Sequence, residues 1–119
     1  MTYKTTRKDL DYFERRVNHW LKFFGLSDWN VSAYLGDMRE ADNLAECEMW
    51  HNSHGAHIRL REDFKYRPER EWLDRLAMHE VAHILLCDLK RLINDRCVTD
   101  NQAETAEHAI IRRLENALT

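Results

Sequence analysis

The chain has 119 residues, of which 44% are hydrophobic and 33% are charged, and its formal net charge is −3. This length suits one domain that buries about two thirds of its unfolded surface without needing disulfides. The charge gives no reason to expect general binding to nucleic acid or to an acidic membrane surface. We therefore expect a single globular domain spanning residues 1–119.

The N-terminal stretch Met1–Lys8 lacks the apolar core of a signal peptide. No apolar run approaches the roughly 20 residues that are needed to cross a bilayer. Cys47, Cys87 and Cys97 form no Cys-x-x-Cys pair. With no export signal, reduced thiols in a cytoplasmic protein are the simplest interpretation.

A first helix is predicted from Arg7 to Phe24. Thr6 can cap this helix with Asp9 three residues further on, and Gly25 suits the position just after its C-terminal cap. Apolar residues recur at steps of three and four and form one stripe. The stripe consists of Leu10, Phe13, Val17, Leu21 and Phe24.

From Trp29 to Leu60 the apolar period changes to strict alternation, which is typical of half-buried strands. Three such runs cover residues 29–35, 45–49 and 56–60, with turn-forming residues at 52–55. We expect a small, mainly antiparallel three-stranded sheet packed on three helices, which is an α+β fold.

The second helix is predicted from Pro68 to about Leu89, because Pro68 suits a first helical turn. This helix is apolar around much of its circumference, so we expect it to be central and largely buried. The last helix is predicted from Asp100 to near Leu118, with Thr99 and Gln102 as a capping box.

The second helix carries the motif His79-Glu80-Val81-Ala82-His83. Residues four apart lie on one face of a helix, so His79 and His83 can direct their imidazoles to one point. This spacing suits a shared Zn²⁺ ion, with Zn–N distances of about 2.0–2.1 Å. Glu80 is rotated by about 100° around the helix axis, where it can take a proton from a metal-bound water.

Two histidines leave a catalytic zinc site one protein ligand short. In the last helix Glu107 lies near the centre of the apolar stripe. That stripe consists of Ala103, Ile110, Ile111, Leu114 and Leu118. A carboxylate in such a place costs several kcal/mol unless something pairs with it, and a zinc ion would do so. We therefore predict Glu107 as the third ligand, with Glu104 and His108 as open alternatives.

With these residues in place, the chain resembles the zincin metallopeptidases, above all their minimal bacterial and phage versions of the gluzincin or SprT-like type. The resemblance rests on the motif at 79–83, the strand sequences at 29–31 and 56–60, and Glu107 within residues 107–114. It implies one Zn²⁺ ion bound by His79, His83 and Glu107, Glu80 as general base, and a peptide or protein substrate. It also implies that the outermost strand, matched to residues 56–60, lines the cleft and pairs with an extended peptide.

The chain departs from these families at several points. It lacks the Asn-Glu-x-x-Ser-Asp setting of thermolysin-type relatives, and it has no C-terminal zinc ribbon like that of SprT-type proteases. The residue that holds the oxyanion is open among Tyr34, His57, Tyr66 and Arg112.

Three alternatives to a general peptidase stay open. The first is a regulatory protease of the ImmA/IrrE type, which cleaves one partner protein with the same zinc chemistry. The second is a non-catalytic domain in which zinc clamps the two long helices through a fourth protein ligand. The third is a metal-free helical interaction module, in which Glu107 pairs with an arginine such as Arg75.

Overall fold

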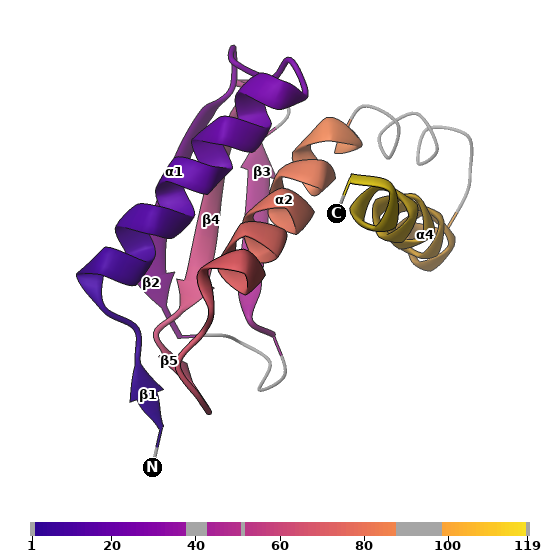
Figure 1. Ribbon diagram of the computed structural model, residues 1–119. Coiled ribbons are helices and arrows are strands. Elements are labelled where there is room, and N and C mark those ends of the chain that lie inside the picture. Colours follow the sequence, from indigo (N-terminus) through magenta and orange to yellow (C-terminus); the bar gives the residue numbers. More distant parts are fainter. Residues whose placement is uncertain (1, 38–42, 51, 88–98, 119) are drawn as a thin grey trace.

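The computed structural model describes residues 2–37, 43–50, 52–87 and 99–118 (Figure 1). Within these ranges the protein is α+β, with three helices, a three-stranded sheet and a separate two-stranded ladder. The helices are α1 (Arg7–Phe23), α2 (Arg70–Leu85) and α4 (Asp100–Leu118). The strands are β1 (Tyr3–Lys4), β2 (Asn30–Gly36), β3 (Ala45–Trp50), β4 (Gly55–Arg61) and β5 (Asp63–Phe64). None of the described helices is long and apolar enough to span a membrane.

Helix α1 begins at the residue that its sequence predicts. The backbone amide of Asp9 donates to Thr6 Oγ1 at 3.2 Å, and the amide of Thr6 donates to Asp9 Oδ2 at 3.0 Å, so the capping box is confirmed. The helix ends at Phe23, one residue earlier than expected. Gly25 follows with a φ of +71°, a left-handed conformation that glycine adopts without a steric penalty.

The three-stranded sheet has the order β2-β4-β3 and is mixed, because β4 is parallel to β2 and antiparallel to β3. This corrects the expectation of a mainly antiparallel sheet. It also places the strand at 56–60 in the centre, so that strand is not the outermost one. Alternation along a strand fixes which side chains face the core, but it carries no information on which strands are neighbours.

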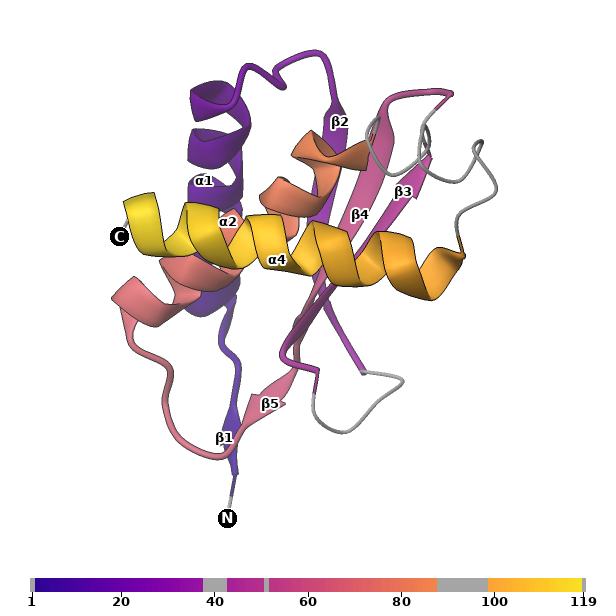
Figure 2. The same cartoon turned by 90° about the vertical axis from the view of Figure 1, so that its right-hand side faces the viewer.

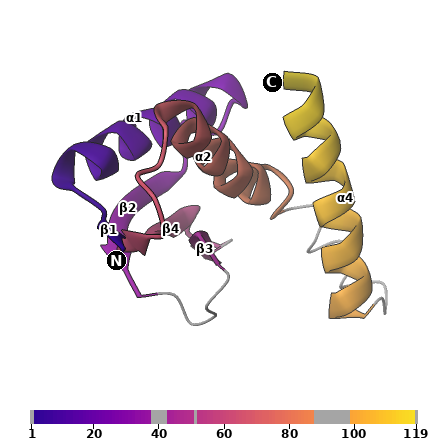
Figure 3. The ribbon, with the colours of Figure 1, turned by 60° about the horizontal axis from the view of Figure 1, so that its bottom comes forward.

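Helices α1 and α2 lie side by side over one face of this sheet (Figures 1 and 3). Ala56, Ile58 and Leu60 of β4 are at most 1% exposed and belong to the same hydrophobic core as the apolar stripe of α1. The core is reinforced by one polar network between the helices. Asp74 Oδ1 accepts hydrogen bonds from Arg16 Nε at 2.6 Å and from Trp20 Nε1 at 2.8 Å.

Helix α2 begins at Arg70 with Glu69 as its cap, so Pro68 precedes the helix and is not in its first turn. Helix α2 ends at Leu85, with Leu86 as its C-terminal cap, so the predicted end near Leu89 was too late.

Helix α4 packs against α2 and crosses it (Figures 2 and 3). Its predicted capping box is confirmed. The amide of Gln102 donates to Thr99 Oγ1 at 3.2 Å, and the amide of Thr99 donates to Gln102 Oε1 at 3.3 Å. The start of α4, the helix that packs against α2, is therefore encoded by residues close together in the sequence.

Replacing Thr6 with Ala removes the hydroxyl that accepts the Asp9 amide proton. We expect the free energy of unfolding to fall by about 1 kcal/mol, which is typical for the loss of a helix cap. Urea unfolding followed by circular dichroism measures this as a lower midpoint with an unchanged slope. The control is Thr2→Ala, an exposed threonine before the helix. Equal losses in both variants would contradict a capping role for Thr6.

Candidate metal centre

The two motif histidines lie one turn apart on α2, with their ring centroids separated by 5.1 Å. The helix is uninterrupted here because residues 70–85 contain no Gly or Pro and their apolar side chains are buried in the core. The side chains of His79 and His83 are 30% and 16% exposed. They lie at the edge of the core, where an ion could reach them.

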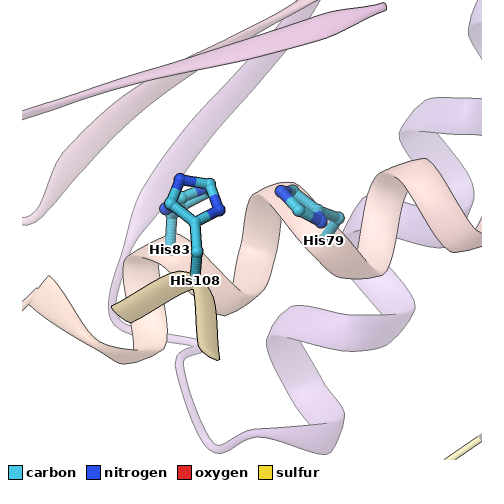
Figure 4. Close-up of side chains that lie close together, drawn as sticks. All are labelled: His79, His83 and His108. Atoms are coloured by element: carbon cyan, nitrogen blue, oxygen red, sulfur yellow. The ribbon is translucent and has the colours of Figure 1, made fainter. Parts of the chain in front are cut away.

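His108 of α4 joins this pair (Figure 4). One potential ligand atom from each of His79, His83 and His108 lies within 4.8 Å of the other two. The ring centroid of His108 is 5.9 Å from that of His79 and 5.0 Å from that of His83. Imidazole nitrogens are preferred zinc ligands, and three of them leave one coordination position open. The residues present therefore fit one zinc ion.

Burial lowers the pKa of His108, and the neighbouring His83 and His79 lower it further. The neutral ring is the form of histidine that binds a metal, so this environment favours the ligand state. The sequence left His108 as an open alternative to Glu107 for the third ligand. The crossing of α4 over α2 brings it to the histidine pair.

Glu107 is buried, with 4% of its surface exposed, as expected from its place in the apolar stripe. Its Oε1 lies 2.8 Å from Nδ1 of His83. In this arrangement the carboxylate contacts the back of a predicted ligand ring. Its role as a direct metal ligand stays a prediction.

Glu115 is a residue that sequence reasoning missed. Its Oε1 lies 2.6 Å from Nδ1 of His79. Glu115 follows Ile111 by four residues, and Ile111 is 0% exposed, so a helical wheel places the carboxylate on the buried side of α4. The four-residue spacing from Ile111 was therefore the sequence signal that Glu115 faces the core.

The Nδ1 atoms of His79 and His83 are thus both held by carboxylates of α4. This leaves Nε2 of each ring for a metal ion. A carboxylate on the far nitrogen fixes the tautomer and orientation of a ligating histidine and raises its basicity. Helix α4 therefore supplies one candidate ligand and two orienting carboxylates.

Glu80 is 5% exposed, and its Oε2 has no hydrogen-bond partner among the described residues. Burial raises its pKa, while the nearby His83 and His79 act in the opposite direction. A buried carboxylate beside a histidine pair is suited to accept and release a proton. An unsatisfied buried polar atom is also costly, which is common at functional sites.

These groups open into a cavity of about 630 Å³. Helix α2 contributes His79, Glu80 and His83 to its walls, α4 contributes residues 104, 107 and 108, and β3 contributes residues 45–49. The edge strand beside the site is therefore β3, while the central strand β4, which contains residues 56–60, contributes His57 and Arg59 to the cavity wall. Of the four oxyanion candidates, His57 alone is among the described residues that line this cavity.

The other histidines that the structure describes, His19, His54 and His57, lie outside this cluster of potential ligands. His54 stacks on Trp29 with centroids 5.0 Å apart, and its Nδ1 lies 2.8 Å from Asp28 Oδ2. His57 packs edge-on against Trp50, with centroids 4.7 Å apart. Within the described part of the chain, His79, His83 and His108 form the one cluster suited to a metal ion.

Comparison of the chain with protein-family models, with curated proteins and with solved structures finds no match. The interpretation of the site therefore depends on its own geometry and chemistry.

Proposed function

We propose that this protein is a zinc-dependent metallopeptidase in which Glu80 is the general base. The observation that supports this proposal is the convergence of His79, His83 and His108, whose ligand atoms lie within 4.8 Å of one another beside the buried Glu80 carboxylate. A cavity bounded by the edge strand β3 gives a peptide access to these groups. In this proposal the architecture is a minimal zincin-type fold with α2 as its central helix.

One Zn²⁺ ion would be held by His79, His83 and a third ligand from α4. Two residues compete for the third position. Glu107 is the ligand that the sequence predicts, whereas the geometry favours His108, because its ligand atom already lies with those of the pair. Glu107 instead holds the Nδ1 atom of His83. We propose His108 as the ligand and Glu107 as the residue that positions His83.

When bound, zinc supplies Lewis acidity and lowers the pKa of a coordinated water toward 7. Glu80 performs the proton transfers: its carboxylate accepts a proton from the attacking water and delivers it to the departing amine nitrogen. Little bulk water reaches this carboxylate, since Glu80 is 5% exposed. Glu107 and Glu115 hold the two imidazoles in orientation.

The structural-zinc alternative takes a specific form at this site. Glu107 lies directly beside His83, so three histidines and Glu107 could supply four protein ligands and a closed site. In this form Glu107 would leave His83 Nδ1 and turn to the ion, and the protein would bind zinc and hydrolyse nothing. An ImmA/IrrE-type protease would share the proposed chemistry but would cleave one partner protein.

The first test of the proposed function is Glu80→Gln. We expect the purified wild-type protein to carry about one zinc ion per chain, as a single three-ligand site requires. The variant should keep its zinc and lose hydrolysis of a fluorescein-labelled unfolded protein by at least about 10²-fold, because the proton acceptor is gone. Elemental analysis and fluorescence release provide the two readouts.

Glu71→Gln is the matched control, since Glu71 is an exposed glutamate in the first turn of the same helix. Its activity and zinc content should equal those of the wild type. Undiminished turnover in Glu80→Gln removes that residue from the proposed role. A folded wild-type protein that contains no metal when purified without added zinc would overturn the proposal as a whole.

The third ligand is tested by comparing His108→Ala with Glu107→Ala. If His108 is the ligand, its loss should abolish stoichiometric zinc binding. Loss of Glu107 should lower zinc affinity by about 10–100-fold, as expected for an orienting partner. Competition with a chromophoric chelator measures both affinities. The reverse order would transfer the third position to Glu107, and unchanged binding in both variants would point to Glu104.

The orienting role of Glu115 is tested by Glu115→Gln. The amide keeps the shape of the side chain but removes the charge that holds His79 Nδ1 at 2.6 Å. We expect an affinity for zinc about 10–100-fold lower, with the fold intact by circular dichroism. Glu71→Gln again serves as control. An unchanged affinity would show that the contact between Glu115 and His79 has no part in metal binding.

A further inference from the structure

The edge of β3 that faces the cavity has no strand partner among the described residues, because β3 pairs with β4 alone. An open strand edge presents unpaired amides and carbonyls to which an extended peptide can add as a further strand. Strand β3 has 6 residues, and five of them, 45–49, line the metal cavity. A peptide lying along it would extend beyond the bond to be cut.

The start of β3 is held in place by Arg61 of the central strand. The amide of Arg61 donates to the Leu44 carbonyl at 3.0 Å, and Arg61 Nη1 donates to the Asn43 carbonyl at 3.3 Å. Asn43 Nδ2 also donates to Glu46 Oε1 at 3.1 Å. Asn43 and Ala45 line the metal cavity, whereas the residue between them, Leu44, lines a second hollow. The two hollows therefore adjoin at the start of β3.

This second hollow is a groove of about 440 Å³ between the start of β3 and the start of α2. Its apolar walls are formed by Leu44, Phe64, Pro68 and Trp72. Phe64 and Trp72 pack edge to face, with ring centroids 5.5 Å apart, so this part of the groove is well ordered. At its rim Tyr66 is 75% exposed, which is unusual for a large apolar ring.

We propose that this groove is a specificity subsite that binds one large apolar side chain, aromatic or long aliphatic, of the peptide substrate. The occupant is a residue of the same segment that pairs with β3. Strand β3 has 6 residues. A peptide paired along its whole length would therefore place the apolar side chain within about six residues of the scissile bond. This inference rests on the proposed peptidase function and adds the class of substrate: peptides with a bulky apolar residue at one fixed position from the cut.

Two measurements test the subsite. In the first, wild-type protein digests a mixed library of peptides from unfolded proteins, and mass spectrometry records the residues around each cut. We expect Phe, Leu, Met or Trp to be enriched at one fixed position within about six residues of the cut. Leu44→Ser and Tyr66→Ser should each reduce this enrichment by roughly 10-fold, a typical cost for losing apolar contacts in a pocket.

Phe23→Ser is the matched control, because Phe23 is 56% exposed on α1 and is not among the groove's lining residues. It should leave the enrichment unchanged. Cleavage by the wild type without any positional enrichment would overturn the subsite and leave the peptidase proposal intact.

The second measurement does not depend on hydrolysis. ¹⁵N-labelled Glu80→Gln protein is titrated with acetyl-Ala-Ala-Phe-Ala-Ala-amide and, in parallel, with the all-alanine peptide. We expect the phenylalanine peptide alone to shift the amide signals of Leu44 and Phe64 and the indole signal of Trp72. Absence of these shifts would overturn the subsite. Shifts in a protein whose wild type hydrolyses no peptide would support the groove and overturn the peptidase proposal.

Discussion

The contact between α2 and α4 is the interaction on which the candidate site depends. Glu107 and His83 are both removed from most solvent, and a buried carboxylate is tolerated only with a polar partner. Glu107 has such a partner in His83, at 2.8 Å, and the half-buried Glu115 has one in His79. The same contacts bring His108 to the histidine pair. Without them α2 would carry only half of a site.

The sheet contributes a wall rather than ligands. Because β4 occupies the centre of the β2-β4-β3 order, β3 is left at the edge beside α2 and borders the cavity. Arg61 of β4 fixes the residues just before β3, so the edge and the adjoining apolar groove are ordered together. Among the described residues, the mixed sheet thus leaves β3 with one free edge next to the histidine cluster, an arrangement suited to an extended peptide.

Local signals predicted most of the elements. The boxes at Thr6 and Thr99 mark helix starts because each satisfies otherwise unpaired amides through residues three positions apart. Alternation located all three main strands, and the apolar stripe of α4 predicted the burial of Glu107. The start of α2 was predicted at Pro68, two residues before the observed start at Arg70. The signals of proline in a first turn and of proline just before a cap differ little in sequence.

The sequence by itself determined the helix that carries His79, Glu80 and His83, since their relative placement follows from helical geometry over five residues. It also determined that a carboxylate of the last helix would be buried. Only the tertiary structure decided that His108 and Glu115 join the site and that β3, not β4, is the edge strand beside it. The physical reason is that strand order and helix crossing depend on packing between segments distant in sequence, and neither periodicity nor capping encodes that packing.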